Sequence, residues 1–280
     1  MSSCFRRALI VSIPGFLLLL PDAMVSAQDL TLDQLIEHNV NAAGGAAAIE
    51  AIQSIRFDLH IADPGFEADG IYYAARPGRM RIDITVGGKH VYTEALDGKR
   101  GWQWKGSGDV VDESETATGA LRHGVELPDK LFGLHEVRQR GNKLELAGRE
   151  MVDKINYYVL RLTFGDGATT TLYLDPKSWL ITRRRSVRAL HPDIDPTTTT
   201  IETTMTDFRK IGGVLFAFAS TDTDLKTGQV LEKASTREIT LNPSIDPAFF
   251  KTLESPPASV SSPIPAEKTR NPDRSQVAFR

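Results

Sequence analysis

Histidine and cysteine are the residues whose spacing would most directly indicate chemistry in this sequence. The six histidines are far apart, and none forms a His-x-x-x-His or His-Glu-x-x-His pair. Cys4 is the single cysteine, so a thiolate metal cluster is excluded. The pattern predicts no metal site, and only a meeting of His60 and His90 from separate strands with a nearby carboxylate would support a hydrolase.

Other catalytic signatures are missing or better explained as turns. Gly106-Ser107-Gly108 lacks the Gly-x-Ser-x-Gly spacing of a nucleophile elbow. Gly165-Asp166-Gly167 joins two alternating segments with no helix after it, which predicts a hairpin turn rather than a phosphate loop. Carboxylates are numerous, but the spacing fixes no acid and base pair. We therefore expect no enzyme, no catalytic residue and no cofactor.

Charge gives one local basic patch and no overall basic field. Arg183-Arg184-Arg185 and Arg188 form the patch, and strand alternation predicts Arg183 and Arg185 on one face with Arg184 on the other. A solvated strand is the favoured interpretation, with an anion or partner site as the alternative. Lys and Arg total 33 against 36 Asp and Glu, a net charge of −3, so nucleic acid is not expected as a partner.

The first residues have the pattern of an export signal. Arg6 and Arg7 precede an apolar run of about a dozen residues, and the small-residue motif Val25-Ser26-Ala27 follows it. Because a spanning helix needs about 20 apolar residues, a signal peptide cleaved after Ala27 is favoured over an uncleaved anchor. Cys4 precedes the run, so neither disulfides nor a lipid-modified cysteine are expected in the mature chain.

Hydrophobic periodicity predicts which elements position the remaining residues. From Asp29 to Gln53 the spacing is helical and is interrupted at Gly44-Gly45, which predicts two short helices. Beyond Ser54 the period changes to two, which is typical of half-buried strands. The predicted strands are 55–61, 70–75, 79–86, 90–96, 100–104, 144–148, 157–164, 169–174, 179–187, 198–208, 214–221 and 230–241.

Short turns join most of these strands, so we expect one antiparallel meander without parallel crossovers. Asp109 to Gly141 has no clear strand and weak helical spacing around Leu121, Leu131 and Leu134. We interpret it as an insertion over one face or mouth of the sheet, with a surface loop as the alternative.

Three segments follow from these patterns. Residues 1–27 are expected to be the signal peptide and residues 28–253 one folded domain. Residues 254–280, rich in Pro and Ser, are expected to be a disordered tail.

Several motifs, in this order, resemble the periplasmic lipoprotein-carrier superfamily of the LolA and LolB type, especially its outer membrane lipoprotein-sorting members. They combine turn chemistry with packing positions and none is catalytic. The motifs are Gly44-Gly45-Ala46-Ala47-Ala48-Ile49, Ile52-Gln53-Ser54-Ile55, Leu96-Asp97-Gly98 with Gly101-Trp102, Leu146-Ala147-Gly148-Arg149-Glu150-Met151-Val152-Asp153, Asp166-Gly167, Tyr173-Leu174-Asp175-Pro176 and Leu241-Asn242-Pro243-Ser244-Ile245-Asp246-Pro247-Ala248-Phe249.

The resemblance implies a mainly β (α+β) fold: a single curved antiparallel sheet forming an unclosed half-barrel, with N-terminal helices covering its open side. It also implies an apolar cavity that holds acyl chains and a periplasmic location. Because burial of each methylene contributes about 0.8 kcal/mol, such a cavity would shield one long chain from water. The chain is longer than the small carriers of this family.

Apolar residues that alternation places on strand faces, with three from the first helix, are the candidates for the cavity lining. Trp102 and Trp104 share a face and are the first choice, since large aromatic surfaces dominate such contacts. The candidates are Phe57, Leu59, Ile71, Tyr73, Ile82, Ile84, Val91, Trp102, Trp104, Leu160, Leu162, Leu172 and Leu174 on strands, and Leu35, Ile36 and Val40 on the helix.

Two functions are consistent with this resemblance. The first is a soluble periplasmic carrier that binds lipid or the acyl chains of lipoproteins and transports them toward the outer membrane. Its partners would then include a membrane protein that donates or accepts the cargo. The alternative is a module that senses lipid or lipoprotein and acts on a protein partner, as in envelope-stress regulators.

Overall fold

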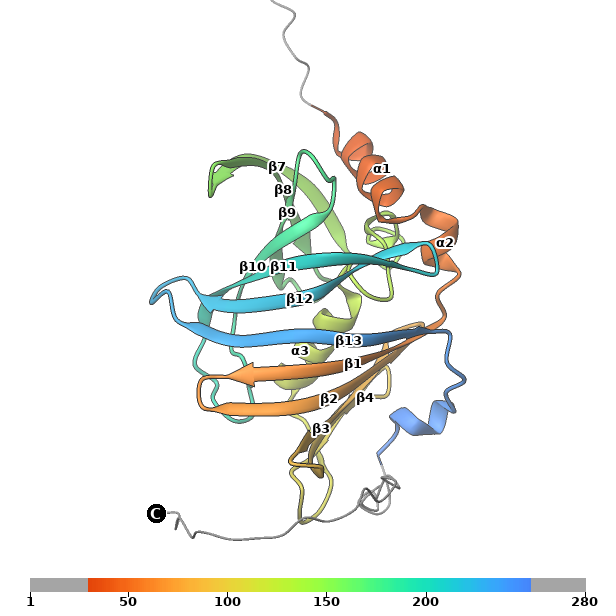
Figure 1. Cartoon of the computed structure of the whole chain (residues 1–280), viewed down its shortest axis with the longest axis vertical. Helices are drawn as coiled ribbons and strands as arrows, with labels where there is room; N and C mark the ends of the chain where they lie inside the picture. Colours follow the sequence, from red (N-terminus) through yellow and green to blue (C-terminus); the bar gives the residue numbers. More distant parts are fainter. Residues whose placement is uncertain (1–29, 253–280) are drawn as a thin grey trace, which may run out of the picture. The chain divides into compact units, whose positions relative to one another are not determined.

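The described part of this computed structural model, residues 30–252, is built on one sheet of thirteen antiparallel strands (Figure 1). The expected signal peptide and tail lie outside the described residues. The strands are β1 (Ser54–Asp63), β2 (Phe66–Ala75), β3 (Arg79–Val86), β4 (Lys89–Leu96), β5 (Gly101–Trp104), β6 (Val111–Asp112), β7 (Lys143–Val152), β8 (Ile155–Thr163), β9 (Thr169–Leu174), β10 (Ile181–Arg188), β11 (Thr199–Ile211), β12 (Val214–Asp224) and β13 (Val230–Leu241).

The sheet has two arms that meet at its centre. Its strand order is β6-β5-β4-β3-β2-β1-β13-β12-β11-β10-β9-β8-β7. We call β1 to β6 the first arm and β7 to β13 the second arm. The expected single meander is wrong at this point, because β1 pairs with β13 and the segment after β6 leads to the opposite edge of the sheet. The expected mainly β, unclosed half-barrel is confirmed, since β6 and β7 remain at separate edges.

Five short helices accompany the sheet in residues 30–252. They are α1 (Leu32–Ala43), α2 (Ala46–Glu50), α3 (Glu115–Glu126), η1 (Leu134–Glu136) and η2 (Pro247–Phe250). None of these helices is long and apolar enough to cross a membrane.

The two N-terminal helices form where the sequence predicts them. Thr31 and Gln34 make a capping box at the start of α1, and Gly44 ends the helix with φ +130°. A Cβ atom at Gly44 would lie 2.4 Å from the carbonyl oxygen of Gly213, so only glycine fits where α1 meets the β11–β12 turn.

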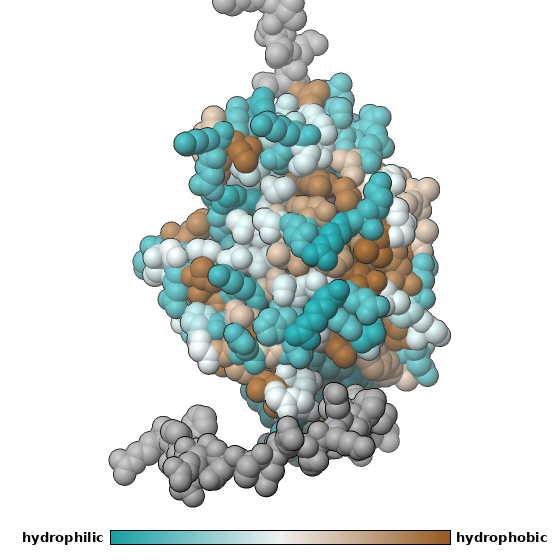
Figure 2. All heavy atoms as spheres, in the orientation of Figure 1, coloured by the Kyte–Doolittle hydropathy of each residue, from teal (hydrophilic) through white to brown (hydrophobic). Residues whose placement is uncertain are grey.

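One face of the sheet, which we call the inner face, carries the main apolar core. Direct strand partners share a face, so the pairs Phe57–Tyr72 and Tyr72–Ile82 identify the inner face of the first arm. These residues pack with Val125 and Phe132 of the insertion. In Figure 1, α3 is seen behind the central strands, whose visible face is the outer face and is mostly hydrophilic in Figure 2.

The segment between β5 and β7 is therefore an insertion over the inner face, as predicted. Helix α3 contacts β3, β4 and β5, and His123 on α3 stacks on Phe164 after β8. Arg76 fixes the other end, because its guanidinium donates to both carboxylate oxygens of Glu136 and to the Leu131 carbonyl. The sequence did not indicate the two-residue strand β6 within this segment.

Candidate functional site

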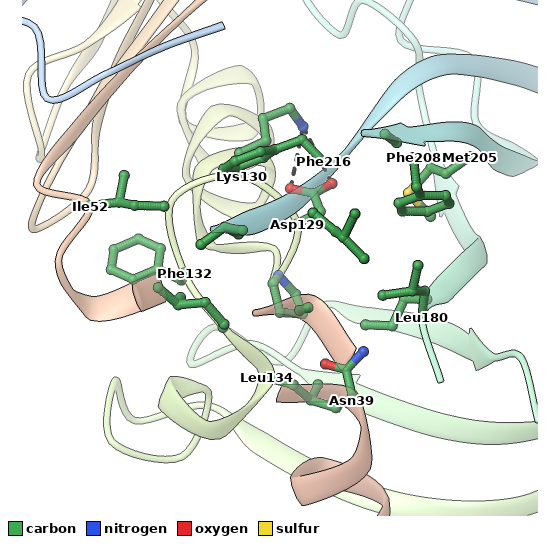
Figure 3. A pocket seen from close by; sticks show the side chains of 18 residues that line it. Asn39, Ile52, Asp129, Lys130, Phe132, Leu134, Leu180, Met205, Phe208 and Phe216 are labelled. Atoms are coloured by element: carbon green, nitrogen blue, oxygen red, sulfur yellow. Dashed lines mark hydrogen bonds and ion pairs between the residues drawn. The ribbon is translucent and has the colours of Figure 1, made fainter. Parts of the chain in front are cut away.

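A small pocket lies where the N-terminal helices, the insertion and the second arm meet (Figure 3). Its walls are mostly apolar, and Phe132 and Leu180 approach it from opposite sides. Asp129 and Lys130 add charge, and Asp129 also accepts a hydrogen bond of 2.5 Å from Arg184. At about 60 Å³ it is far smaller than the roughly 300–1,000 Å³ typical of small-molecule sites. An acyl chain would enter this region only if the insertion moved.

The candidates on the second arm form a sealed core. Leu160, Leu162, Leu172 and Leu174 share the face that carries Tyr158, and each is at most 1% exposed. Tyr158 stacks on Trp179, which in turn stacks on His38 of α1. These leucines are therefore covered in the described structure.

Four candidates on the first arm share the inner face. Phe57 is buried, whereas Leu59, Ile82 and Ile84 keep part of their surface accessible. Gly70 lies between these side chains, because a Cβ there would be 3.3 Å from Cδ1 of Ile84 and 3.6 Å from Cβ of Leu59. We call Leu59, Ile82 and Ile84 the inner strip. It is a half-buried apolar surface whose side chains lie close together over Gly70.

The two tryptophans, the first choice from the sequence, lie on the outer face. Trp102 pairs with Ala95 and Trp104 with Thr93, opposite to the face of Glu94 and Gln103. Trp102 is 1% exposed and donates a hydrogen bond of 2.9 Å to the Phe250 carbonyl. The segment that contains η2 thus covers the Trp102 side chain on the outer face.

Ile71 and Tyr73 are also on the outer face, and Tyr73 packs edge-on against Phe249. The prediction that these two residues line the same cavity as Phe57 was wrong. Alternation shows only which residues within a single strand share a face. The register across the β1–β2 turn decides which of those faces meets the core.

The remaining candidates occupy other environments. Val91 lies at a bulge of β4, opposite the step between Ile84 and Thr85. On α1, Leu35 is fully buried, while Ile36 and Val40 line a surface groove together with His135 and Arg138. The sequence grouped these residues into one lining, and the structure separates them.

A group of polar residues beside the inner strip was missed from the sequence. Glu94 is the strand partner of Ile82, and Tyr92 is that of Ile84, so both are on the inner face. Gln103 on β5 and Glu113 before α3 lie beside them and are 3% and 9% exposed. We call Tyr92, Glu94, Gln103, Glu113 and Asp193 the carboxyl cluster. The alternation of β4, which places Glu94 among apolar neighbours, was the signal that could have indicated it.

Burial perturbs the acids of this cluster. It raises the pKa of Glu113 to about 9, and the neighbouring carboxyls of Asp193 and Glu94 add to the effect. It also raises the pKa of Glu94 to about 7, although this side chain is only half-buried. Burial therefore disfavours the ionised form of both acids.

A loop between β10 and β11, residues 189–198, carries Asp193 to the insertion. The carboxylate of Asp193 accepts hydrogen bonds from the Ser114 backbone N–H at 2.9 Å and from its hydroxyl at 2.5 Å. Gln103 donates to the same carboxylate at 3.4 Å. This loop therefore connects the second arm to the start of α3.

A second set of charged residues is on the inner face of the second arm. Arg188 donates to Asp222 at 2.6 Å, and Thr203 donates to the other oxygen of that carboxylate at 2.6 Å. Burial and the charges of Asp222 and Asp63 raise the pKa of nearby Glu232 to about 7. The inner face thus changes from apolar near α2 to polar toward the 189–198 loop.

The other residues considered for chemistry have separate partners. His60 contacts Asp69 at 3.2 Å, whereas His90 contacts the Thr93 hydroxyl at 2.8 Å. Residues 30–252 contain no group of three or more His, Cys, Asp or Glu placed to hold a metal ion.

The arginine patch divides between the faces as alternation predicted. Arg183 and Arg185 pair with Glu202 on the outer face, and Arg184 pairs with Asp129 on the inner face. A solvated strand is therefore not the full description of this patch. Gly165 to Gly167 forms the predicted turn between β8 and β9.

The sequence matches no protein-family model. It has no significant match among curated proteins either. Among solved structures, a DUF1329 family protein from Desulfovibrio piger is 13% identical with a TM-score of 0.54, covering 80% of this chain and 98% of that chain.

A LolA superfamily protein from Nitrosomonas europaea is 15% identical with a TM-score of 0.52, covering 80% of this chain and 99% of that chain. The chain therefore has the fold of these proteins, and the fold expected from the resemblance is confirmed.

Proposed function

We propose that the chain is an exported carrier that binds lipid or the acyl chains of lipoproteins against the inner strip. The observation that carries the proposal is the accessible apolar surface of Leu59, Ile82 and Ile84 on the inner face of an unclosed half-barrel. Buried apolar area is the main source of affinity for an acyl chain, at about 25 cal/mol per Å². The likeness in fold to a LolA superfamily protein supports the family resemblance from which this proposal comes.

The insertion is the element that would have to move for a long chain to bind. Val125, Leu131 and Phe132 fill the inner side of the sheet near α2, so their displacement would extend the inner strip into a larger cavity. Ion pairs and hydrogen bonds hold the insertion at its two ends, through Arg76 and Asp193. Because the insertion is held at both ends, its middle can move away from the inner face while the sheet stays intact.

The experiment is a titration of the full chain with dodecyl maltoside, a neutral probe, below its critical micelle concentration. Binding is followed by native mass spectrometry. Ile84→Asp places a charge on the inner strip and is expected to weaken binding by about tenfold or more. Met151→Asp is the matched control, because Met151 is 64% exposed and lies on β7, away from the strip.

The circular dichroism spectrum establishes that each variant is folded. Should Ile84→Asp fail to fold, Ile84→Ala is expected to weaken binding by a smaller factor. Absence of binding to the unmodified chain, or equal binding by the Ile84 variants and the unmodified chain, would contradict the proposal.

Sensing of lipid with action on a protein partner remains the second proposal from the sequence. It shares the acyl-binding step with the carrier and differs in the fate of the bound lipid. A stable complex with an envelope protein, recovered only when the inner strip is occupied, would favour it over transfer of cargo to an acceptor membrane.

A further inference from the structure

The carboxyl cluster contains more hydrogen-bond acceptors than there are protein donors nearby to pair with them. Glu113 is only 9% exposed, and within the described residues its carboxyl has no hydrogen-bond partner other than the carboxyls of Asp193 and Glu94, to which it can bind only through a shared proton. Buried polar atoms are nearly always paired in folded proteins, and leaving one unpaired is unfavourable.

Gln103 gives an independent sign of the same deficit. Its amide nitrogen donates to Asp193 at 3.4 Å, so its carbonyl oxygen Oε1 lies beside the same cluster. That oxygen also lacks a partner within residues 30–252, and the residue is only 3% exposed. An amide oxygen accepts hydrogen bonds without titrating, so protonation of the cluster does not satisfy it.

The charge of the cluster is poorly balanced. Lys105 acts on Glu113 and Asp193, but its side chain is exposed. Tyr92 donates to Glu94 at 3.3 Å and supplies one neutral donor. The acids therefore create a local field that favours positive charge.

The cluster is next to apolar surface. Glu94 and Tyr92 are the direct strand partners of Ile82 and Ile84, whose side chains share the inner face with them. Opposite residues of an antiparallel pair have Cβ atoms about 4.5–5.5 Å apart. A molecule with one cationic end and one apolar end would therefore contact both the carboxyls and the inner strip.

We infer that the carboxyl cluster binds a primary ammonium group of the ligand whose acyl chain lies on the inner strip. This rests on the proposed function and specifies its cargo as an amphiphile with a protonated amine. A primary ammonium has three N–H donors and a positive charge, which match the unpaired oxygen of Gln103 and the carboxyls of Glu113 and Asp193, which otherwise have to share a proton.

The experiment compares three probes of equal chain length on the full chain: dodecylammonium, dodecyltrimethylammonium and dodecanoate. We expect dodecylammonium to bind about tenfold or more tightly than dodecanoate. Dodecyltrimethylammonium has the charge without N–H donors and is expected to bind with intermediate affinity. Calorimetric titration below the critical micelle concentrations gives the three dissociation constants.

The double variant Glu94→Gln and Glu113→Gln removes two acids and retains similar side-chain volume. It is expected to lose the preference for dodecylammonium while binding of dodecyl maltoside stays unchanged. Glu238→Gln is the control, since Glu238 is exposed and is the strand partner of Asp58 on the outer face. It is expected to leave the order of the probes unchanged. If the double variant does not fold, each single variant is tested in the same way.

Protons compete with the ammonium for these carboxyls, which gives a second readout. Affinity for dodecylammonium is expected to rise between about pH 6 and pH 9 as Glu94 and Glu113 lose protons, with Tyr92, Asp193 and Lys105 as the other titratable groups at the cluster. Dodecyl maltoside affinity is expected to change much less over this range.

The outcomes separate the two proposals. Equal affinity for dodecylammonium and dodecanoate, with binding of both, would overturn the ammonium site and leave the acyl carrier intact. Absence of binding to every dodecyl probe would overturn both. Retention of the ammonium preference in the double variant would also overturn the site.

Discussion

The inner faces of the two arms both carry apolar residues, but they differ in what surrounds these residues. On the second arm, Leu160 and Leu172 face each other across β8 and β9 with no more than 1% exposure. On the first arm, Ile82 and Ile84 are half-buried and have Glu94 and Tyr92 as strand partners. The β8–β9 part of the second arm is therefore sealed, and the first arm keeps accessible apolar surface beside polar groups that burial has perturbed. Binding is expected on the arm whose core is incomplete.

The largest expected effect tests the sealed arm. Leu160→Ala removes a fully buried side chain and is expected to lower the free energy of unfolding by about 2–5 kcal/mol. Urea denaturation measures this change. Val187→Ala on β10, where the side chain is 70% exposed, is the control and is expected to change stability by less than about 0.5 kcal/mol. A loss below about 1 kcal/mol for Leu160→Ala would mean that this arm is not sealed.

A smaller effect is expected on the open arm. Ile84→Ala removes a half-buried side chain, so the loss of stability is expected to be about 1 kcal/mol. Binding of dodecyl maltoside should weaken in this variant and stay within about twofold in Leu160→Ala. Equal stability losses for the two variants, with equal effects on binding, would remove the distinction between the arms.

A further effect concerns pH. The pKa of Glu113 is raised from 4.5 to about 9 in the folded state, so between these values the folded chain binds more protons than the unfolded chain. The free energy of unfolding therefore falls as pH rises through this window. Glu94 and Glu232 act in the same direction up to about pH 7. Burial lowers the pKa of His191 from 6.5, which acts in the opposite direction below about pH 6.5.

The range from about pH 7 to pH 9 therefore isolates Glu113. Denaturation at a series of pH values should show a declining free energy of unfolding that Glu113→Gln flattens. Glu150→Gln on the second arm is the matched control. Burial opposes ionisation of Glu150, but hydrogen bonds from Arg185 and Tyr173 outweigh it and lower its pKa. Its titration lies below this range, and a flattened slope in this control would argue against the assignment to Glu113.

The sequence predicted the elements better than their arrangement. Period-two alternation located nearly every strand, and Gly44-Gly45 located the break between α1 and α2. Alternation within β5 correctly placed Trp102 and Trp104 on one face, but it carries no information about which face meets the core. That choice depends on pairing with β4 and on η2, which is about 150 residues away in the sequence.

The candidate site was predicted only in part for a similar reason. Ile82, Ile84 and Leu59 were recognised because they are apolar and alternate with polar residues. Glu94 and Glu113 were missed because their proximity depends on β4 and on the start of α3, which local patterns do not relate. The connection between β10 and β11 brings Asp193 to them from still farther along the chain.

The central pairing of β1 with β13 also constrains how the chain reaches its native state. Strand β1 is the first strand to be synthesised and β13 the last, yet eight residues of β1 are in register with β13. Closing this pair brings together segments separated by nearly the whole domain, so it adds a slow, non-local step to folding. Until β13 is available, β1 has one unpaired edge that is able to join strands of other chains. Aggregation during synthesis should therefore be sensitive to truncations that remove residues 230–241, even though that strand contributes nothing to the inner strip.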